Sequence, residues 1–328
     1  MNTKFLLAED VKKKILENWV GYVKIFTPFQ SEFLCGLYKR YQCLDNGNLV
    51  LYFARKTHQA ILRKKDYDLN YDLSFEKFWQ NHSEVEITPS TIINIAKDTN
   101  LPKETTRRKL SELTNQKVFR KKNKHILWLP NEEYKESYNK FVGQEIKSMA
   151  KLTKYVTDRV NIDFTIEEIT EEYKKKFSFY WFHYLDLQLK WMKMWKANLN
   201  DLENVLIFFQ FTVLLSSKIN KNNIISHSKL FTEPNIINNQ FHQDVSVSAT
   251  SISDITGIPR ATCIRKLNQM VKQKIILQDE KTKRYYIIPN ALNKNIVSKD
   301  MTEKVTEIFS EFYFISIKAL SSKSLHSA

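Results

Sequence analysis

The chain carries nearly the same phrase twice, and this repeat limits its fold more than any other feature. "LPKETTRRKL" begins at Leu101, and "IPRATCIRKL" begins at Ile258, 157 residues later. Extended to 18 positions, the two stretches share seven identical residues and four conservative exchanges. Upstream, "NLVLYF" from Asn48 recurs as "NVLIFF" from Asn204 at a spacing of 156. Because the offset is nearly constant over such a long stretch, it predicts that the chain contains a duplicated module.

Each copy of the repeat has the pattern of two short helices joined by a turn. Residues 91–99 and 251–256 are amphipathic at helical spacing, and Asn100 or Gly257 follows, residues that tolerate a left-handed backbone. A proline then stands where a second helix begins, a place where its missing N–H does no harm. The second helix has an inward stripe, formed by Thr106, Leu110 and Leu113 in the first copy and by Cys263, Leu267 and Met270 in the second.

After the second helix, each copy has two short β-like runs around a charged tip. The runs are 118–119 and 125–129 in the first copy, and 275–277 and 285–288 in the second. Helix, turn, helix and hairpin together predict a winged helix-turn-helix. Outside these modules, the pattern predicts helices over 11–26, 29–42, 49–62, 132–159, 179–196, 202–218 and 292–320, with an extended connection over 220–244.

The expected fold class is therefore mainly α with small β-hairpin wings. Two duplicated winged helix-turn-helix modules would form a pseudo-dimer linked by long helices. We expect a first helical segment and winged module over 1–130, with the module itself at about 88–130. A long connecting helix would follow over 131–162, and the second helical segment, its module (about 247–289) and a C-terminal helix over 163–328.

The charge of the chain points to a polyanionic partner. Its formal net charge is +15, from 51 Lys and Arg against 36 Asp and Glu. The windows 102–125 and 259–286, which hold the second helices and the hairpins, carry +13 of this total. A single run of charge is usually a solvated face. Two runs at equivalent positions of a repeat favour nucleic-acid binding instead.

Composition argues against several other classes of protein. With five glycines and no Gly-rich phosphate motif, a dinucleotide fold is not expected. The three cysteines form no CxxC pair, which fits a reducing cytoplasm, and the seven histidines have no metal-ligand spacing. The apolar patch at the N-terminus is too short for a signal peptide, and no run reaches membrane-spanning length. We expect a soluble, cytoplasmic, nucleoid-associated protein that is no enzyme and needs no cofactor or metal.

The repeated stretches carry a family resemblance. "INIAKDTNLPKETTRRKL" and "TSISDITGIPRATCIRKL", each followed by a basic hairpin, resemble winged-helix transcriptional regulators of the broad MarR/GntR/IclR type. The resemblance covers about 40 residues per copy, roughly a quarter of the chain. It implies sequence-specific binding of double-stranded DNA, with the second helix in the major groove and the wing along the backbone or minor groove. It also implies that the two modules of one chain occupy adjacent major grooves.

The resemblance assigns roles to residues by position. Ile264 replaces Arg107, and acidic residues stand in the second hairpin, so the two copies should read unequal half-sites. The implied base contacts are Lys103, Thr105, Arg107 and Arg108 in the first copy and Arg260, Thr262, Ile264 and Arg265 in the second. The implied phosphate contacts are Lys109, Lys117, Arg120, Lys121, Lys122, Lys124, Lys266, Lys274, Lys281, Lys283 and Arg284.

Three other functions remain open at this point, one of them an undetected enzyme, which would need a polar pocket with perturbed acids. A replication initiator of plasmid or phage type also combines two winged helices, and it would bind directly repeated sites and open the strands. A winged-helix module that binds protein and no DNA would leave the basic faces solvated. The aromatic stretch 177–195 suits an effector pocket less well than a core, and Cys263 suits a buried position better than a redox sensor. A small-molecule effector and the choice between monomeric pseudo-dimer and homodimer stay open.

Overall fold

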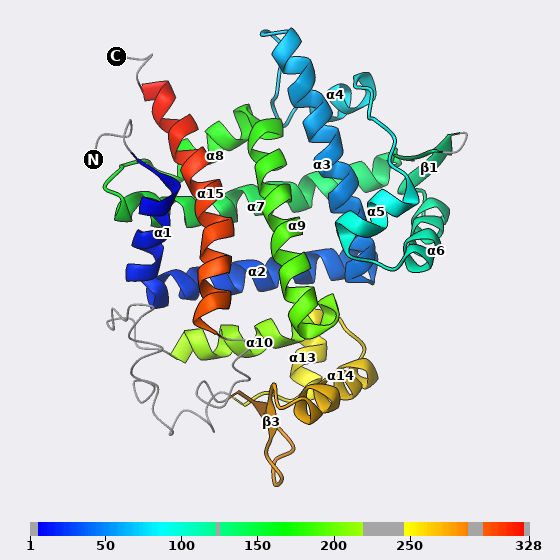
Figure 1. The fold of residues 1–328 in the computed structure, drawn as a ribbon, viewed down its shortest axis with the longest axis vertical. Coiled ribbons are helices and arrows are strands. Elements are labelled where there is room, and N and C mark those ends of the chain that lie inside the picture. The colour runs from blue at the N-terminus through cyan, green and yellow to red at the C-terminus, as the bar shows by residue number, and fades with distance from the viewer. Residues whose placement is uncertain (1–5, 123–124, 219–245, 288–297, 325–328) are drawn as a thin grey trace. The chain divides into compact units, whose positions relative to one another are not determined.

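The computed structural model describes residues 6–122, 125–218, 246–287 and 298–324, and this part of the chain is mainly helical with two small antiparallel hairpins (Figure 1). The coarse fold class predicted from the sequence is thereby confirmed. The elements are α1 (Ala8–Glu17), α2 (Trp19–Tyr41), α3 (Leu44–Tyr67), α4 (Phe78–Glu84), α5 (Ile92–Thr99), α6 (Lys103–Asn115), β1 (Phe119–Lys122), β2 (His125–Trp128), α7 (Glu132–Arg159), α8 (Ile166–Lys175), α9 (Phe177–Leu199), α10 (Leu202–Lys218), α13 (Ala249–Thr256), α14 (Arg260–Lys272), β3 (Leu277–Gln278), β4 (Tyr285–Tyr286) and α15 (Lys299–Ser324).

The order and lengths of the elements recur along the chain. α1 and α8 have 10 residues each, and α2 and α9 have 23 each. α5 and α13 have 8 residues each, and α6 and α14 have 13 each. A two-stranded hairpin follows α6 and another follows α14, and a long helix comes next in both cases.

The helices form two compact units, and each unit takes helices from both halves of the chain. Unit 1 comprises Met1–Phe5, Asp45–Lys193 and Phe312–Ala328, and unit 2 comprises Leu6–Leu44 and Met194–Glu311. Unit 2 therefore contains α1 and α2 together with α10, α13 and α14. Unit 1 contains α8 and most of α9 together with α3 to α7. The segments expected from the sequence, in contrast, follow the order of the chain.

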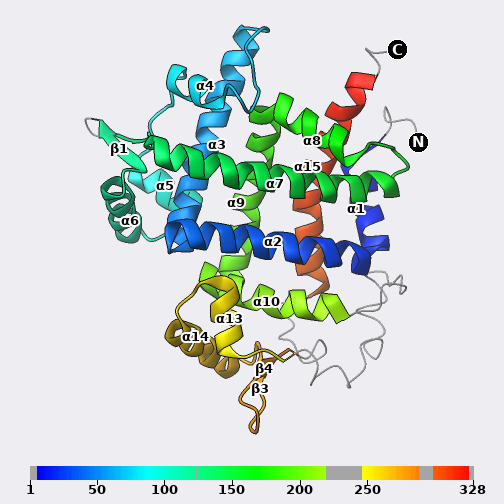
Figure 2. The ribbon, with the colours of Figure 1, turned by 180° about the vertical axis from the view of Figure 1, so that it is seen from behind.

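The core of unit 1 is largely aromatic. The ring of Phe78 in α4 lies 4.6 Å from that of His58 in α3 and 5.4 Å from that of Phe177 in α9, measured between centroids. Trp181 donates from its indole nitrogen to the hydroxyl of Tyr138 in α7 at 3.1 Å. α8 packs along α7 in the same unit (Figure 2). The aromatic stretch 177–195 therefore supplies buried core side chains, which is the role that its spacing favours.

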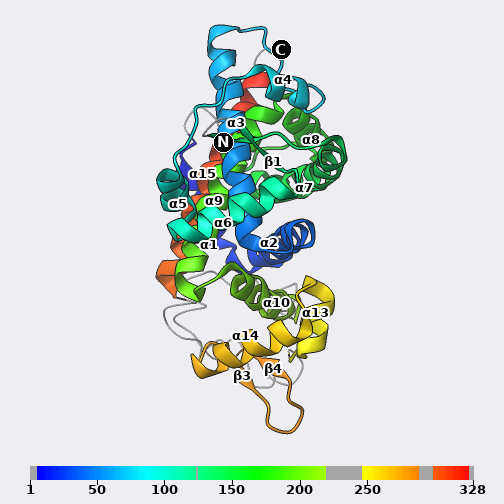
Figure 3. The same ribbon diagram turned by 90° about the vertical axis from the view of Figure 1, so that its right-hand side faces the viewer.

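In unit 2, α2 runs alongside α10 (Figures 1 and 2). The amide of Gln210 donates to the hydroxyl of Ser31 at 2.9 Å, and the hydroxyls of Thr27 and Ser216 lie 3.1 Å apart. All four side chains are buried, so these bonds satisfy polar groups that would otherwise be costly inside the apolar contact. The α13–α14 pair and the β3–β4 hairpin belong to the same unit (Figure 3).

Several helix boundaries were predicted well, but α2 was not. α7 and α10 have the predicted ends, whereas the expected break between 26 and 29 does not occur and α2 continues through Pro28. Proline in a helix interior costs about 3 kcal/mol. Phe26, Phe29 and Phe33 are at most 5% exposed, and burying three such side chains contributes about 5–9 kcal/mol, which outweighs that cost. The break lies instead at Asn18, and α4 and α8 were not predicted.

Candidate nucleic-acid interface

Two segments of the fold contain the predicted DNA-facing residues. The first segment is α5, α6, β1 and β2 in unit 1, and the second segment is α13, α14, β3 and β4 in unit 2. α5 starts after Thr91 and α13 after Ser248, and each hydroxyl accepts a backbone N–H of its helix, at 3.2 and 3.0 Å. As predicted, the turns are left-handed at Asn100 (φ 53°) and Gly257 (φ 75°).

The second helix of each segment is anchored by the predicted inward stripe. The thiol of Cys263 donates towards the carbonyl oxygen of Ile258 at 3.4 Å, and burial raises the pKa of this thiol. The stripe residues are each at most 1% exposed: Thr106, Leu110, Leu113, Cys263, Leu267 and Met270.

Both second helices end in the same backbone geometry. Lys117 follows α6 with φ 59°, and Lys274 follows α14 with φ 56°. Their N–H groups donate to the carbonyl oxygens of Thr114 and Val271 at 3.0 and 2.9 Å. A left-handed backbone costs roughly 1 kcal/mol in a residue with a side chain. Its presence at equivalent lysines shows that the two segments turn into their hairpins alike.

The strands of the hairpins begin and end within three residues of where the sequence placed them. β1 pairs with β2 so that Phe119 faces Trp128, and β3 pairs with β4 so that Leu277 faces Tyr286. In the second segment, Val247 forms an antiparallel bridge with Tyr285 of β4, so the chain just before α13 contacts the hairpin.

Most of the predicted DNA-facing side chains are accessible. Exposed base-contact candidates are Lys103, Arg107, Arg108, Arg260 and Arg265, whereas Thr105, Thr262 and Ile264 are half-buried. Exposed phosphate candidates are Lys117, Arg120, Lys121, Lys274, Lys281, Lys283 and Arg284. Lys124 and the side chain of Lys122 lie outside the described part of the chain.

Lys109 and Lys266 are placed differently from the prediction. Each is 6% exposed, and its ammonium is directed into its own unit. Lys266 donates to the carboxylate of Asp201 at 2.7 Å and to the amide oxygen of Asn204 at 3.4 Å. Lys109 lies 3.5 Å from the amide oxygen of Asn46. This placement does not fit the predicted phosphate contacts of the two lysines, which instead tie α6 and α14 to neighbouring elements.

The arginines of the two second helices differ in their surroundings. Arg107 pairs with Glu104 at 2.8 Å and Arg108 pairs with Glu112 at 2.6 Å, both along α6. α14 contains no acidic residue, and Arg260 donates to the hydroxyl of Thr250 at 3.0 Å. Exposed ion pairs contribute little to stability, but the two glutamates reduce the positive charge that α6 presents.

The side chain of Arg284, an exposed phosphate candidate, also makes bonds within the second segment. Its guanidinium donates to the hydroxyl of Ser246 at 3.0 Å and to the backbone oxygen of the same residue at 2.8 Å. It therefore fixes the start of β4 to Ser246, shortly before α13, while remaining exposed.

The described residues place four of the seven histidines considered from the sequence. Among the described residues, no group of three or more His, Cys, Asp or Glu side chains is arranged to hold a metal ion. His58 and His82 are buried in the aromatic core of unit 1, His125 is exposed and His183 is half-buried. The remaining three histidines lie outside the described part.

Sequence reasoning missed one cluster of polar side chains. Lys56, Gln59 and Arg63 lie on one face of α3 and line a small cavity in unit 1. Their spacing of three and four residues was a readable signal, because it places side chains on the same side of a helix. The cavity also needs residues 86–88, and no local pattern predicted that this segment lies opposite α3.

Comparisons with known proteins found no family model, curated protein or solved structure that matches the chain. No helix in the described ranges is long and apolar enough to cross a membrane.

Proposed function

We propose that this protein binds double-stranded DNA in a sequence-specific manner and acts as a transcriptional regulator. α6 and α14 would each enter a major groove, and the hairpins that follow would lie along the backbone. The observation that carries the proposal is the matched construction of the two segments. Each presents an exposed basic face on a helix whose opposite face is fully buried.

The chemistry of the exposed residues supports this function. A guanidinium can donate to both acceptors of a guanine in the major groove, and Arg108 and Arg265 occupy equivalent exposed places. Ile264 has no donor and suits a thymine methyl, while Arg107 at the equivalent place suits guanine. Because the two copies differ here, we expect two unequal half-sites read by one chain.

Binding to random-sequence duplex DNA over a salt series is the test. Fluorescence anisotropy would compare the wild type with Arg107→Ala/Arg108→Ala and with Arg260→Ala/Arg265→Ala. The control is Lys147→Ala/Lys151→Ala, which removes the same charge from exposed positions on α7. If six phosphates are neutralised, the slope of log K against log salt should be about −5.

The arginine variants should bind more weakly and with a shallower slope than the control. Equal weakening by all three double variants would mean that only net charge matters, and the proposed interface would be wrong. Absence of binding at low salt would reject DNA binding itself. A footprint of one chain with two separate protected patches would support the use of both segments.

A second measurement uses the glutamates of α6. Glu104→Gln/Glu112→Gln frees both arginines of that helix without removing them. We expect tighter DNA binding, by about threefold to tenfold, because the like charges facing the phosphates are removed. Unchanged affinity would show that α6 does not approach the DNA.

A further inference from the structure

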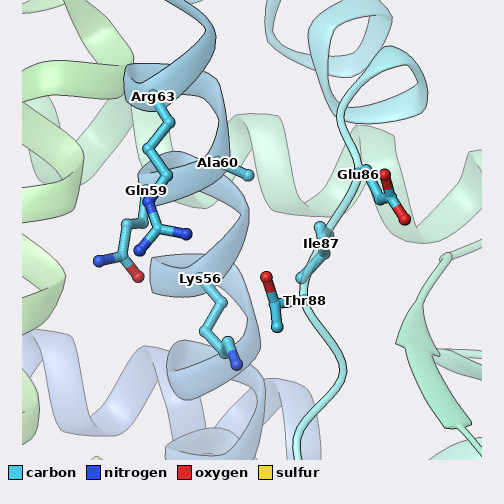
Figure 4. A pocket seen from close by; sticks show the side chains of 7 residues that line it. All are labelled: Lys56, Gln59, Ala60, Arg63, Glu86, Ile87 and Thr88. Carbon is cyan, nitrogen blue, oxygen red and sulfur yellow. The ribbon is translucent and has the colours of Figure 1, made fainter.

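A small polar cavity in unit 1 lies between α3 and the segment that leads to α5. Its volume is about 190 Å³, and Lys56, Gln59, Ala60 and Arg63 of α3 line one side of it. The facing side is formed by Glu86, Ile87 and Thr88, as Figure 4 shows.

The positive charges around this cavity are not balanced locally. Among the described residues, no carboxylate lies within ion-pair distance of Lys56 or Arg63, whereas Arg55 nearby is paired with Asp186 at 2.8 Å. The carboxylate of Glu86 points away from α3 in Figure 4, and the ammonium of Lys56 donates to the hydroxyl of Ser90. Neither cation is therefore held in an ion pair, although Glu86 also lines the cavity.

The surroundings of Lys56 also lower its pKa. Burial lowers it, and the charges of Arg55 and Arg63 lower it further, while Asp98 acts in the opposite direction. An anion in the cavity would relieve this repulsion. The amide of Gln59 and the hydroxyl of Thr88 have no hydrogen-bond partner within the described chain, so both are available to such an anion.

We infer that this cavity binds a phosphate group. An ammonium and a guanidinium match the charge of a phosphate dianion, and the guanidinium can donate two parallel hydrogen bonds to its oxygens. A volume of about 190 Å³ leaves room for a phosphate. The rest of a larger phosphorylated molecule would lie outside.

The site belongs to the first copy of the repeat alone. At the offset of 156, the positions of Lys56, Gln59 and Ala60 are occupied by Thr212, Leu215 and Ser216, none of which is charged. Ser216 is buried against α2. The cavity is therefore not a by-product of the repeated architecture.

The location of the cavity links its occupant to the first segment. Ser90, which accepts from Lys56, directly precedes Thr91, the residue that caps α5. A phosphate that draws Lys56 and Thr88 together would hold the start of α5 in place. A free phosphorylated compound and the DNA backbone are the two sources of such a phosphate, and the binding chemistry is the same for both.

Methyl NMR of the full chain with inorganic phosphate tests the inference without DNA. The methyl groups of Ala60, Ile87 and Thr88 line the cavity and serve as probes. We expect their signals to shift saturably with phosphate, with a Kd on the order of 1 mM, and not with chloride at equal ionic strength. Lys56→Met/Arg63→Met should weaken binding at least about tenfold, because two charged hydrogen bonds are lost.

Two further variants keep this test decisive. Arg63→Met alone alters an exposed side chain, so it tests binding even if the double variant fails to fold. Lys147→Met/Lys151→Met removes the same charge elsewhere and should bind phosphate like the wild type. Absence of saturable shifts in the wild type, or equal binding by Arg63→Met, would overturn the site.

A titration with duplex DNA distinguishes the two sources of phosphate. If the DNA backbone fills the cavity, the same three methyl signals shift with DNA, and added phosphate competes. If a free compound fills it, these signals still respond to phosphate in the DNA complex. Both outcomes support the site, and a failure of DNA binding leaves the phosphate result intact, so the two proposals are tested separately.

Discussion

Replacing Lys266 with methionine removes the ammonium that bonds Asp201 and keeps a side chain of similar length. The Lys266 side chain is 8% exposed and that of Asp201 is 35% exposed, so the pair lies between a surface bridge and a buried one. Surface pairs contribute about 0–1 kcal/mol, whereas breaking a buried pair costs about 3–5 kcal/mol. We therefore expect Lys266→Met to lower the free energy of unfolding by about 2 kcal/mol.

Asp201 both pairs with Lys266 and caps α10, and one substitution can remove the ion pair while keeping the cap. One carboxylate oxygen of Asp201 also accepts the backbone N–H of Asn204 at 2.7 Å, at the start of α10. Asp201→Asn keeps an oxygen for this bond and removes only the charge. In a double-mutant cycle, Lys266→Met and Asp201→Asn together should destabilise by less than the sum of the single changes, with a coupling of about 1 kcal/mol.

Thermal unfolding followed by circular dichroism measures the effect. About 2 kcal/mol corresponds to a decrease in Tm of roughly 4–8 °C for a unit of this size. Lys272→Met is the control, because it removes the same charge from an exposed place on α14. Equal Tm values for Lys266→Met and the control, or a cycle without coupling, would refute the claim that this ion pair holds α14.

Three other predictions concern single residues. Burial lowers the pKa of His82 to about 4, against the effect of its bond to the Trp128 carbonyl. The folded-state pKa is thus below the ordinary 6.5, so the stability present above pH 6.5 is lost as the pH falls towards 4, by at most about 3 kcal/mol. Over this range the Tm of His82→Gln should change less than that of the wild type. Asn100→Gly should keep the stability measured in urea, whereas Asn100→Ala should lose about 1 kcal/mol because φ is 53°. In the native protein, iodoacetamide should modify the buried Cys263 more slowly than the half-buried Cys43. Mass spectrometry measures both rates, and similar rates would contradict the burial of Cys263.

The parts of the fold that were predictable are those set by near neighbours in the chain. The turns at Asn100 and Gly257 follow from residue type, since few other residues accept a left-handed backbone. The stripe on α6 follows from helical spacing. The start of α8 was also readable, because Thr165 and Glu168 have the spacing of a capping box and form one in the structure.

Lys109 shows how charge can mislead when spacing is ignored. It is three residues after Thr106 and four before Leu113, so the spacing already placed it beside the inward stripe. Its charge suggested a phosphate contact instead. The spacing thus indicates a buried lysine, and a buried lysine needs a polar partner. That partner, Asn46, lies in a part of the chain that local patterns do not connect to α6.

Long-range packing was beyond the reach of the sequence. The apolar face of α2 predicts burial but does not say which helix covers it, and α10 is one of several apolar candidates. The cavity beside Lys56 depends in the same way on residues 86–88, which have no periodicity of their own.

The mixed membership of the two units has a consequence for how the protein is made. α2 ends at Tyr41 and its partner α10 begins at Leu202, so the ribosome must add about 160 residues before the two can meet. At roughly 5–20 residues per second this takes about 8–30 s. During that time α2 lacks this cover, and Phe26, whose ring lies 4.8 Å from that of Phe309 in α15, waits longer still, so the growing chain exposes apolar surface.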